Sequence, residues 1–202
     1  MKLLELAVIQ GVLLSVQGLS YLAVQRNPRT VHDMEGRFDK KIPLVPQTVF
    51  VYILWFPLLA LFPIGLYYCS EKSWMIYMVS TVIDIAISLI IYRLYPTSFD
   101  RPKVGTDTFS GKVLNFMYIV DYKGLNCMPS MHCSTCFIII FTAITCTPMA
   151  GWIQAMVCLL ALMIVVSTVL TKQHVIIDMT TALPLAAVCF GIGAALCNSA
   201  IL

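Results

Sequence analysis

Charged side chains are scarce in this chain of 202 residues: Asp, Glu, Lys and Arg make up only 11% of it. An ordinary soluble domain is about 25% charged. Hydrophobic residues account for 59% of the sequence, which argues against a water-soluble protein and favours a bilayer as its surroundings. The formal net charge of +3 is small and is spread along the chain. It therefore gives no reason to expect nucleic acid as a partner.

Histidine is also rare, and patterns typical of metal sites are missing. There are three histidines, and no cluster of His and Cys has the spacing of a recognised metal site. Most of the eight cysteines lie in or beside apolar runs, which is typical of small buried side chains rather than of disulfides. We therefore expect no bound metal, no cofactor and no structural disulfide.

What the sequence has in abundance is long apolar runs. A spanning helix needs about 20 mainly apolar residues. Six runs approach that length: Leu3–Val24, Thr48–Cys69, Trp74–Tyr95, Met131–Met149, Gly151–Leu170 and Ile176–Leu196. The first run carries three polar side chains, but no A-x-A-like cleavage site follows it, so we count it as a span. The sequence predicts an all-α protein, a six-transmembrane helix bundle that forms a single integral membrane domain over residues 1–202.

The connections between these runs are unequal. Two long polar loops, Arg26–Gln47 and Pro96–Met128, and the turn Leu170–Val175 fall on one side of a six-span protein. That side carries eleven Lys and Arg residues, whereas the other carries only Lys2 and Lys72. The positive-inside rule would place the basic side in the cytoplasm. If several of these cations bind an anion, however, the count is a poor guide to topology.

The stretch "LTKQHVIID" places ionisable groups between the fifth and sixth runs. His174 and Asp178 are four residues apart, so on a helix they would be neighbours on one face. A carboxylate can hold one ring nitrogen as N–H and leave the other as a nucleophile or base. The alternative is an ion pair at a helix end that only contributes to packing.

Two further polar segments fall on the same side of the membrane. In "CMPSMHCS", Ser130 is placed to cap the fourth span and His132 follows in its first turn, which is typical of an anion site. In "YRLYPTSFDRPKV", Arg101 offers a planar fork that suits phosphate oxygens. The alternatives are a plain helix cap with an interfacial histidine, and basic side chains at the headgroup level. Together the segments supply an oriented nucleophile, a proton donor and cations, which metal-free phosphoryl transfer requires.

The three segments, in this order, resemble the type 2 phosphatidic acid phosphatase superfamily, which also includes the vanadium haloperoxidases. The corresponding residues are Arg101-Pro102, then Pro129-Ser130-Met131-His132, then Ser167-Thr168 with His174-x-x-x-Asp178. Met131 replaces a glycine of the family's motif. Thr168 replaces an arginine, for which Lys172 is the substitute cation.

The resemblance implies roles for these residues. His174 would be the nucleophile, oriented by Asp178, and His132 would protonate the leaving group. The phosphate would be bound by Arg101, Lys172, Ser130 and the Met131 backbone N–H. The implied active site lies at one membrane face, which in this family is mostly the non-cytoplasmic one, and we adopt that orientation.

The implied function is a metal-independent lipid phosphate phosphatase. It would hydrolyse a phosphomonoester or pyrophosphate of an amphiphilic membrane lipid through a phosphohistidine intermediate. The stretch Asp39–Pro57 is similar to sphingolipid headgroup synthases, so a lipid phosphotransferase with an alcohol acceptor is an alternative. A second alternative is a membrane protein or transporter that binds an anion without chemistry. Asp84, inside the third run, is expected to hydrogen-bond to a neighbouring helix, with a proton or substrate role as the alternative.

Overall fold

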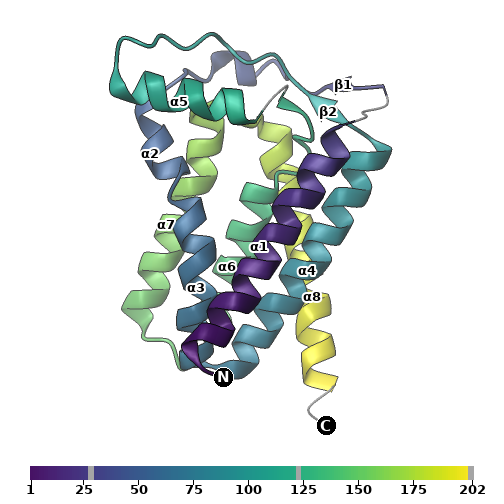
Figure 1. Cartoon of the computed structure of the whole chain (residues 1–202), viewed down its shortest axis with the longest axis vertical. Coiled ribbons are helices and arrows are strands. Elements are labelled where there is room, and N and C mark those ends of the chain that lie inside the picture. Colours follow the sequence, from purple (N-terminus) through teal and green to yellow (C-terminus); the bar gives the residue numbers. More distant parts are fainter. Residues whose placement is uncertain (27–29, 122–123, 200–202) are drawn as a thin grey trace.

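The protein is described by a computed structural model that covers residues 1–26, 30–121 and 124–199. The fold is 74% helical, and its long helices run side by side with the long loops gathered at one end (Figure 1). The helices are α1 Leu3–Gln25, α2 Val49–Tyr52, α3 Trp55–Cys69, α4 Glu71–Leu94, α5 Phe109–Val120, α6 Met131–Thr145, α7 Gly151–Leu170 and α8 Ile176–Ser199. The loops contain two 3-10 turns, η1 Asp39–Lys41 and η2 Pro46–Thr48, and a parallel strand pair, β1 His32–Asp33 with β2 Thr97–Ser98.

Five helical segments in the described ranges are long and apolar enough to cross a membrane. They are Leu3–Gln25, Pro46–Cys69, Glu71–Leu94, Gly151–Leu170 and Ile176–Ser199. Large apolar side chains such as Leu61, Leu159 and Val188 point outward from them, as expected of helices that face lipid. The prediction of an all-helical, multi-pass membrane protein is thus confirmed. The predicted fourth span, Met131–Met149, forms α6, which has only 15 residues and is shorter than a typical spanning helix.

Helix α6 is the central helix of the bundle. It packs against α7 and α8 and also contacts α4, and residues around much of its circumference are buried. Its apolar residues Ile138 and Ile139 belong to the main core, together with side chains from α3, α4, α7 and α8. Because α6 is surrounded by protein, it can carry several Ser and Thr residues whose hydroxyls bond to preceding carbonyls.

The predicted second span is interrupted between α2 and α3. Pro57 has no N–H to donate to the Ile53 carbonyl, so the helical ladder cannot continue there. The Phe56 N–H bonds to that carbonyl instead, at 3.2 Å. The interruption at residues 53–54 lies between Tyr52 and Trp55, which are both buried.

Two polar residues that counted against the first span point into the bundle. The Gln10 amide donates to the Leu59 carbonyl of α3 at 2.8 Å, and the Gln17 amide contacts the Met131 sulfur of α6 at 3.7 Å. Their polarity therefore serves interhelical contacts, which is a common use of amides in membrane helices.

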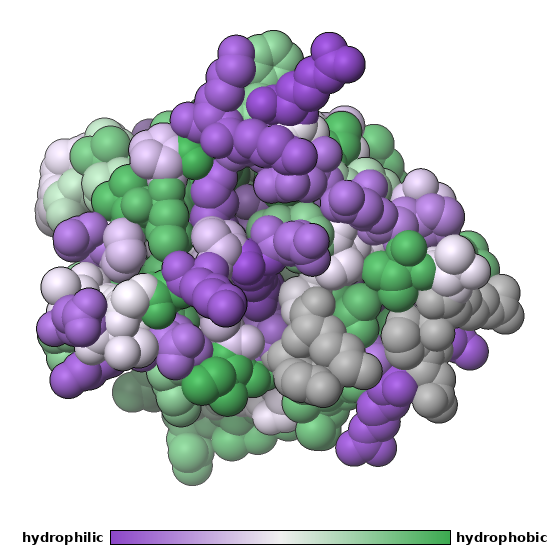
Figure 2. All heavy atoms as spheres, turned by 90° about the horizontal axis from the view of Figure 1, so that it is seen from above, coloured by the Kyte–Doolittle hydropathy of each residue, from purple (hydrophilic) through white to green (hydrophobic). Residues whose placement is uncertain are grey.

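The second long loop is not simply a polar connection. Its residues 109–120 form α5, with Thr108 as the N-cap that accepts from the Gly111 N–H at 3.1 Å. The two long loops are joined by the β1–β2 pair, in which His32 is opposite Thr97. Seen from this end, the molecule gathers hydrophilic side chains over its centre, with apolar side chains around them (Figure 2).

Candidate active site

His174 and Asp178 lie together at the start of α8. The His174 Nδ1 is 3.2 Å from the Asp178 Oδ2, and the same oxygen accepts from the Val175 N–H at 3.0 Å. The predicted contact is confirmed, although its origin is different: His174 precedes the helix, in the turn after α7, and a tight turn brings the ring back over Asp178. Asp178 is fully buried, so its carboxylate is held in one orientation.

His132, in the first turn of α6, faces His174. Its Nδ1 lies 3.4 Å from the His174 Nε2, and its Nε2 lies 2.8 Å from the Tyr52 hydroxyl. One set of proton positions satisfies all these contacts. Tyr52 donates to His132, the Nδ1–H of His132 points to His174, and the Nδ1–H of His174 points to Asp178. In this set the His174 Nε2 carries a lone pair, as a nucleophile requires.

The predicted cap of α6 is also present. Ser130 is buried, and its Oγ accepts from the Cys133 N–H at 3.3 Å. The Ser130 N–H donates to the Asp178 backbone carbonyl at 3.1 Å. This bond joins the N-cap of α6 directly to the first turn of α8. Met131 follows as the first helical residue, and its side chain is buried. This joint holds His132 and His174 next to each other.

Arg101 is bound by Asp121. Its guanidinium forms an ion pair with the Asp121 carboxylate, and its Nη1 donates to the Asp121 carbonyl at 3.1 Å. The Tyr118 ring lies under the guanidinium at 5.1 Å, and the Nε is buried without a hydrogen-bond partner. Burial lowers the pKa of Arg101, but Asp121 raises it, and the net pKa lies above the ordinary value. Arg101 is therefore a permanent cation whose Nε–H has no hydrogen-bond partner.

Lys172 points toward the first long loop. Its Nζ donates to the Asp39 carbonyl at 2.6 Å, and its own backbone is left-handed, with φ of 51°. The Asp39 side chain accepts from the Ile176 N–H at 2.8 Å and so occupies the N-terminus of α8. The loop residue Asp39 therefore bonds to Lys172, which precedes His174 in the chain, and to Ile176, which follows it.

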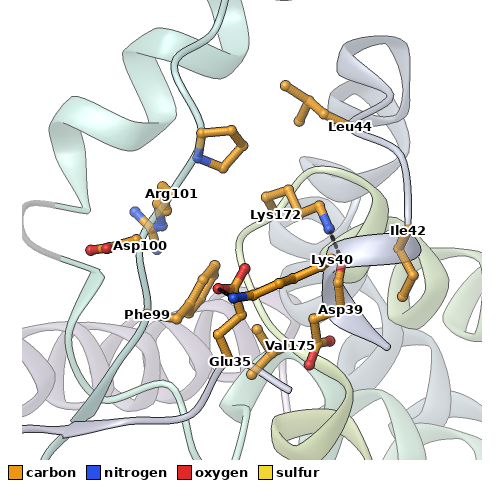
Figure 3. Close-up of a pocket in the computed structure, with 11 residues that line it drawn as sticks. Glu35, Asp39, Lys40, Ile42, Leu44, Phe99, Asp100, Arg101, Lys172 and Val175 are labelled. Carbon is orange, nitrogen blue, oxygen red and sulfur yellow. Dashed lines mark hydrogen bonds and ion pairs between the residues drawn. The ribbon is translucent and has the colours of Figure 1, made fainter. Parts of the chain in front are cut away.

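Arg101 and Lys172 line one cavity of about 450 Å³ on the loop side (Figure 3). Side chains of both charge signs surround it, and Val175 forms part of its wall. The lining residues are Glu35, Asp39, Lys40, Ile42, Leu44, Phe99, Asp100, Arg101, Pro102, Lys172 and Val175. His132 and His174 are not among these residues. The predicted cations and the predicted histidines thus lie in adjacent places rather than in one open pocket.

Sequence reasoning missed several residues that build this site. Tyr52 bonds to His132, and the Trp55 ring packs against it at 4.2 Å between centroids. Asp39 caps α8, and Asp121 pairs with Arg101. Three of them, Asp39, Tyr52 and Trp55, lie in the stretch whose similarity to headgroup synthases was the only available signal. Asp121 had no signal in the sequence.

Asp84 binds a neighbouring helix, as expected. The Ser134 hydroxyl of α6 donates to its Oδ2 at 2.7 Å, while its Oδ1 is buried without a partner. All eight cysteines are free thiols. In the described part of the chain, no group of three or more His, Cys, Asp or Glu residues is arranged to hold a metal ion.

No family model, curated protein or solved structure matches the chain. The resemblance to the phosphatase superfamily therefore rests on the motif residues alone, and the function that they indicate enters as a proposal.

Proposed function

We propose that the protein is a metal-independent lipid phosphate phosphatase that works through a phosphohistidine. The observation that carries the proposal is the connected series Tyr52, His132, His174 and Asp178, at the loop end of an apolar helix bundle. A plain packing role for a histidine needs no second histidine opposite its free nitrogen and no buried carboxylate behind it. Nucleophilic phosphoryl transfer needs both.

In the proposed reaction, the lone pair of the His174 Nε2 attacks phosphorus. A P–N bond forms, the P–O bond to the lipid alkoxide breaks, and protonated His132 gives the alkoxide its Nδ1 proton. Water then attacks phosphorus and loses a proton to His132, and the P–N electron pair returns to His174. Tyr52 suits both stages because its hydroxyl can accept from or donate to the His132 Nε2.

The substrate must separate the two rings, because 3.4 Å between their nitrogens leaves no room for a phosphoryl group. Two cations are proposed to bind the phosphate once it has entered between the rings. The unpaired Nε–H of Arg101 would donate to one phosphate oxygen. The Lys172 Nζ would leave the Asp39 carbonyl and donate to another phosphate oxygen. Ser130 and the Met131 N–H, at the start of α6, complete the proposed phosphate site.

A lipid phosphotransferase with an alcohol acceptor is the second candidate. The observation that favours it is the cavity of about 450 Å³ beside the site, which is in the size range of small-molecule pockets and far larger than a phosphate needs. Part of its wall comes from Asp39 and the residues after it, the start of the stretch similar to headgroup synthases.

We further propose six membrane crossings, with α6 as the fourth spanning helix in addition to the five that are long enough. What supports this count is that α6 lies inside the bundle, and that the start of α1 and the end of α8 lie at the same end (Figure 1). The active site would lie on the non-cytoplasmic side. A Thr106→Cys variant tests the orientation, because this loop residue is exposed. The proposal requires it to react in intact cells with a thiol reagent that does not cross membranes.

The activity test uses purified protein in detergent with EDTA and a panel of lipid phosphates, and measures inorganic phosphate. We expect release that His174→Ala and His132→Ala both abolish and that vanadate inhibits. The matched control is His32→Ala, because His32 stacks on Tyr95 and is not part of the series. Headgroup exchange with an added alcohol such as inositol, without phosphate release, would favour the transferase. Anion binding without either reaction would favour a non-catalytic protein and overturn the proposal.

A further inference from the structure

The outward face of α5 is apolar, although this helix lies in a loop region. Phe109, Phe116, Ile119 and Val120 are 73, 62, 64 and 57% exposed. The opposite face, which packs on the protein, contains Ser110, Gly111 and Leu114. A loop helix in water would have the reverse pattern, with its apolar stripe facing the protein. The outward face therefore requires an apolar partner.

This face continues the surface of a candidate membrane span. Phe109 stacks on Phe50 of α2, with ring centroids 5.8 Å apart and an angle of 21° between the rings. Phe50 is itself 39% exposed, and Leu54, Phe56 and Leu61 continue the exposed apolar surface along the same segment. Figure 1 shows α5 crossing the bundle end beside α2. Whatever covers this flank of the span also reaches the outward face of α5.

The single charge on this face fits a lipid headgroup. Lys112 is exposed and lies between Phe109 and Phe116 at helical spacing. A lysine stem can lie along an apolar surface while its ammonium reaches a phosphate. With 12 residues, α5 is too short to cross a bilayer but suits a helix that lies in the interface.

We infer that α5 is an interfacial membrane helix, whose outward face Phe109, Lys112, Phe116, Ile119 and Val120 is inserted into the lipid at the level where the acyl chains meet the headgroups. Its inner face then connects the membrane to the site. The Tyr118 hydroxyl donates to the Thr171 carbonyl at 2.7 Å, next to Lys172, and its ring lies under Arg101. Insertion of α5 places both Arg101 and Lys172 at the headgroup level of the membrane. The inference about α5 does not require the histidines to be catalytic.

Photo-cross-linking in liposomes of phosphatidylcholine and phosphatidylglycerol tests this inference. Benzoylphenylalanine is placed at Phe116, with Leu159 on the exposed face of α7 as the lipid-facing control and exposed Thr106 as the aqueous control. The expected result is a phospholipid adduct at Phe116 with at least half the yield found at Leu159, and at least tenfold above that at Thr106. The same substitution at Ile119 serves as the second position if the Phe116 variant does not fold. A cross-link to a second copy of the chain, or a lipid yield no higher than at Thr106, overturns the inference.

Discussion

Replacing Asp178 with Asn separates the charge of this side chain from its geometry. The Asp178 Oδ2 accepts from the Val175 N–H as well as lying at the His174 Nδ1. An amide NH₂ group cannot occupy that position, because it would face the Val175 donor. The Asn carbonyl is therefore fixed there and keeps the His174 proton on Nδ1. The negative charge is lost, and the NH₂ group takes the place of the Oδ1, which is buried without a hydrogen-bond partner.

The size of the effect follows from the proposed intermediate. Phosphorylation of the His174 Nε2 creates a cationic ring, which the buried carboxylate stabilises. Removing that charge should raise the barrier by about 2–4 kcal/mol, between the value of a charged hydrogen bond and that of breaking a buried ion pair. At about 1.4 kcal/mol per decade, kcat falls roughly 30- to 1,000-fold. The two hydrogen bonds to a neutral oxygen lower the free energy of unfolding by no more than about 2 kcal/mol, and Tm by no more than about 8 °C.

The assay compares kcat for phosphate release with the Tm of the purified variant. Asp84→Asn is the matched control, because Asp84 is also buried and hydrogen-bonded but belongs to α4 and contacts Ser134. It should leave kcat within about threefold, an activation difference of roughly 0.7 kcal/mol. If Asp178→Asn keeps kcat within the same threefold range, or unfolds the protein while sparing specific activity, the reasoning fails and Asp178 only packs.

Further predictions concern the hydroxyl, the cations and the buried thiol. Tyr52→Phe removes the hydrogen bond to His132 and should lower kcat by roughly tenfold, about 1.4 kcal/mol, with a near-normal Tm; an unchanged kcat would remove Tyr52 from the mechanism. Arg101→Lys loses the planar fork and should weaken vanadate inhibition by about tenfold or more, whereas Asp121→Asn frees the guanidinium and should not weaken it. Equal weakening by both variants would mean that the ion pair is only structural. Burial raises the pKa of the Cys127 thiol well above its ordinary value, so at pH 8 Cys127 of the folded protein is not in its reactive thiolate form. Its alkylation rate, measured by mass spectrometry, should be at least about 100-fold lower in the folded protein than in the unfolded chain.

The parts of the fold that depend on local pattern could be predicted from the sequence. Apolar runs gave the long helices, and Pro129 followed by Ser130 gave the start of α6. His174 and Asp178 are close in the chain and meet as predicted, although through a turn before α8 rather than on one helix face. In each case a short segment contains the physical reason: hydrophobic length, capping chemistry or chain proximity.

The rest depends on contacts between distant segments. Asp121 pairs with the Arg101 guanidinium, and the Asp39 carbonyl accepts from the Lys172 ammonium, so both cations are bound by distant loop residues. A basic residue in a sequence does not show which acid or carbonyl it will meet. Helix α5 was missed for another reason. Its apolar residues are too few for a membrane span, and an apolar face that points outward is expected only for a helix that lies beside a membrane. Both differences arise where the loops fold over the bundle end.

Trapping the phosphorylated enzyme tests the mechanism most directly. A lipid phosphate labelled with ³²P is mixed with the protein, quenched in alkali within milliseconds and digested, and the labelled peptide is identified by mass spectrometry. We predict acid-labile label on the peptide that contains His174, lost in His174→Ala and retained in His32→Ala. Phosphate release without any labelled His174, or label on another residue, would contradict a phosphohistidine mechanism at this site.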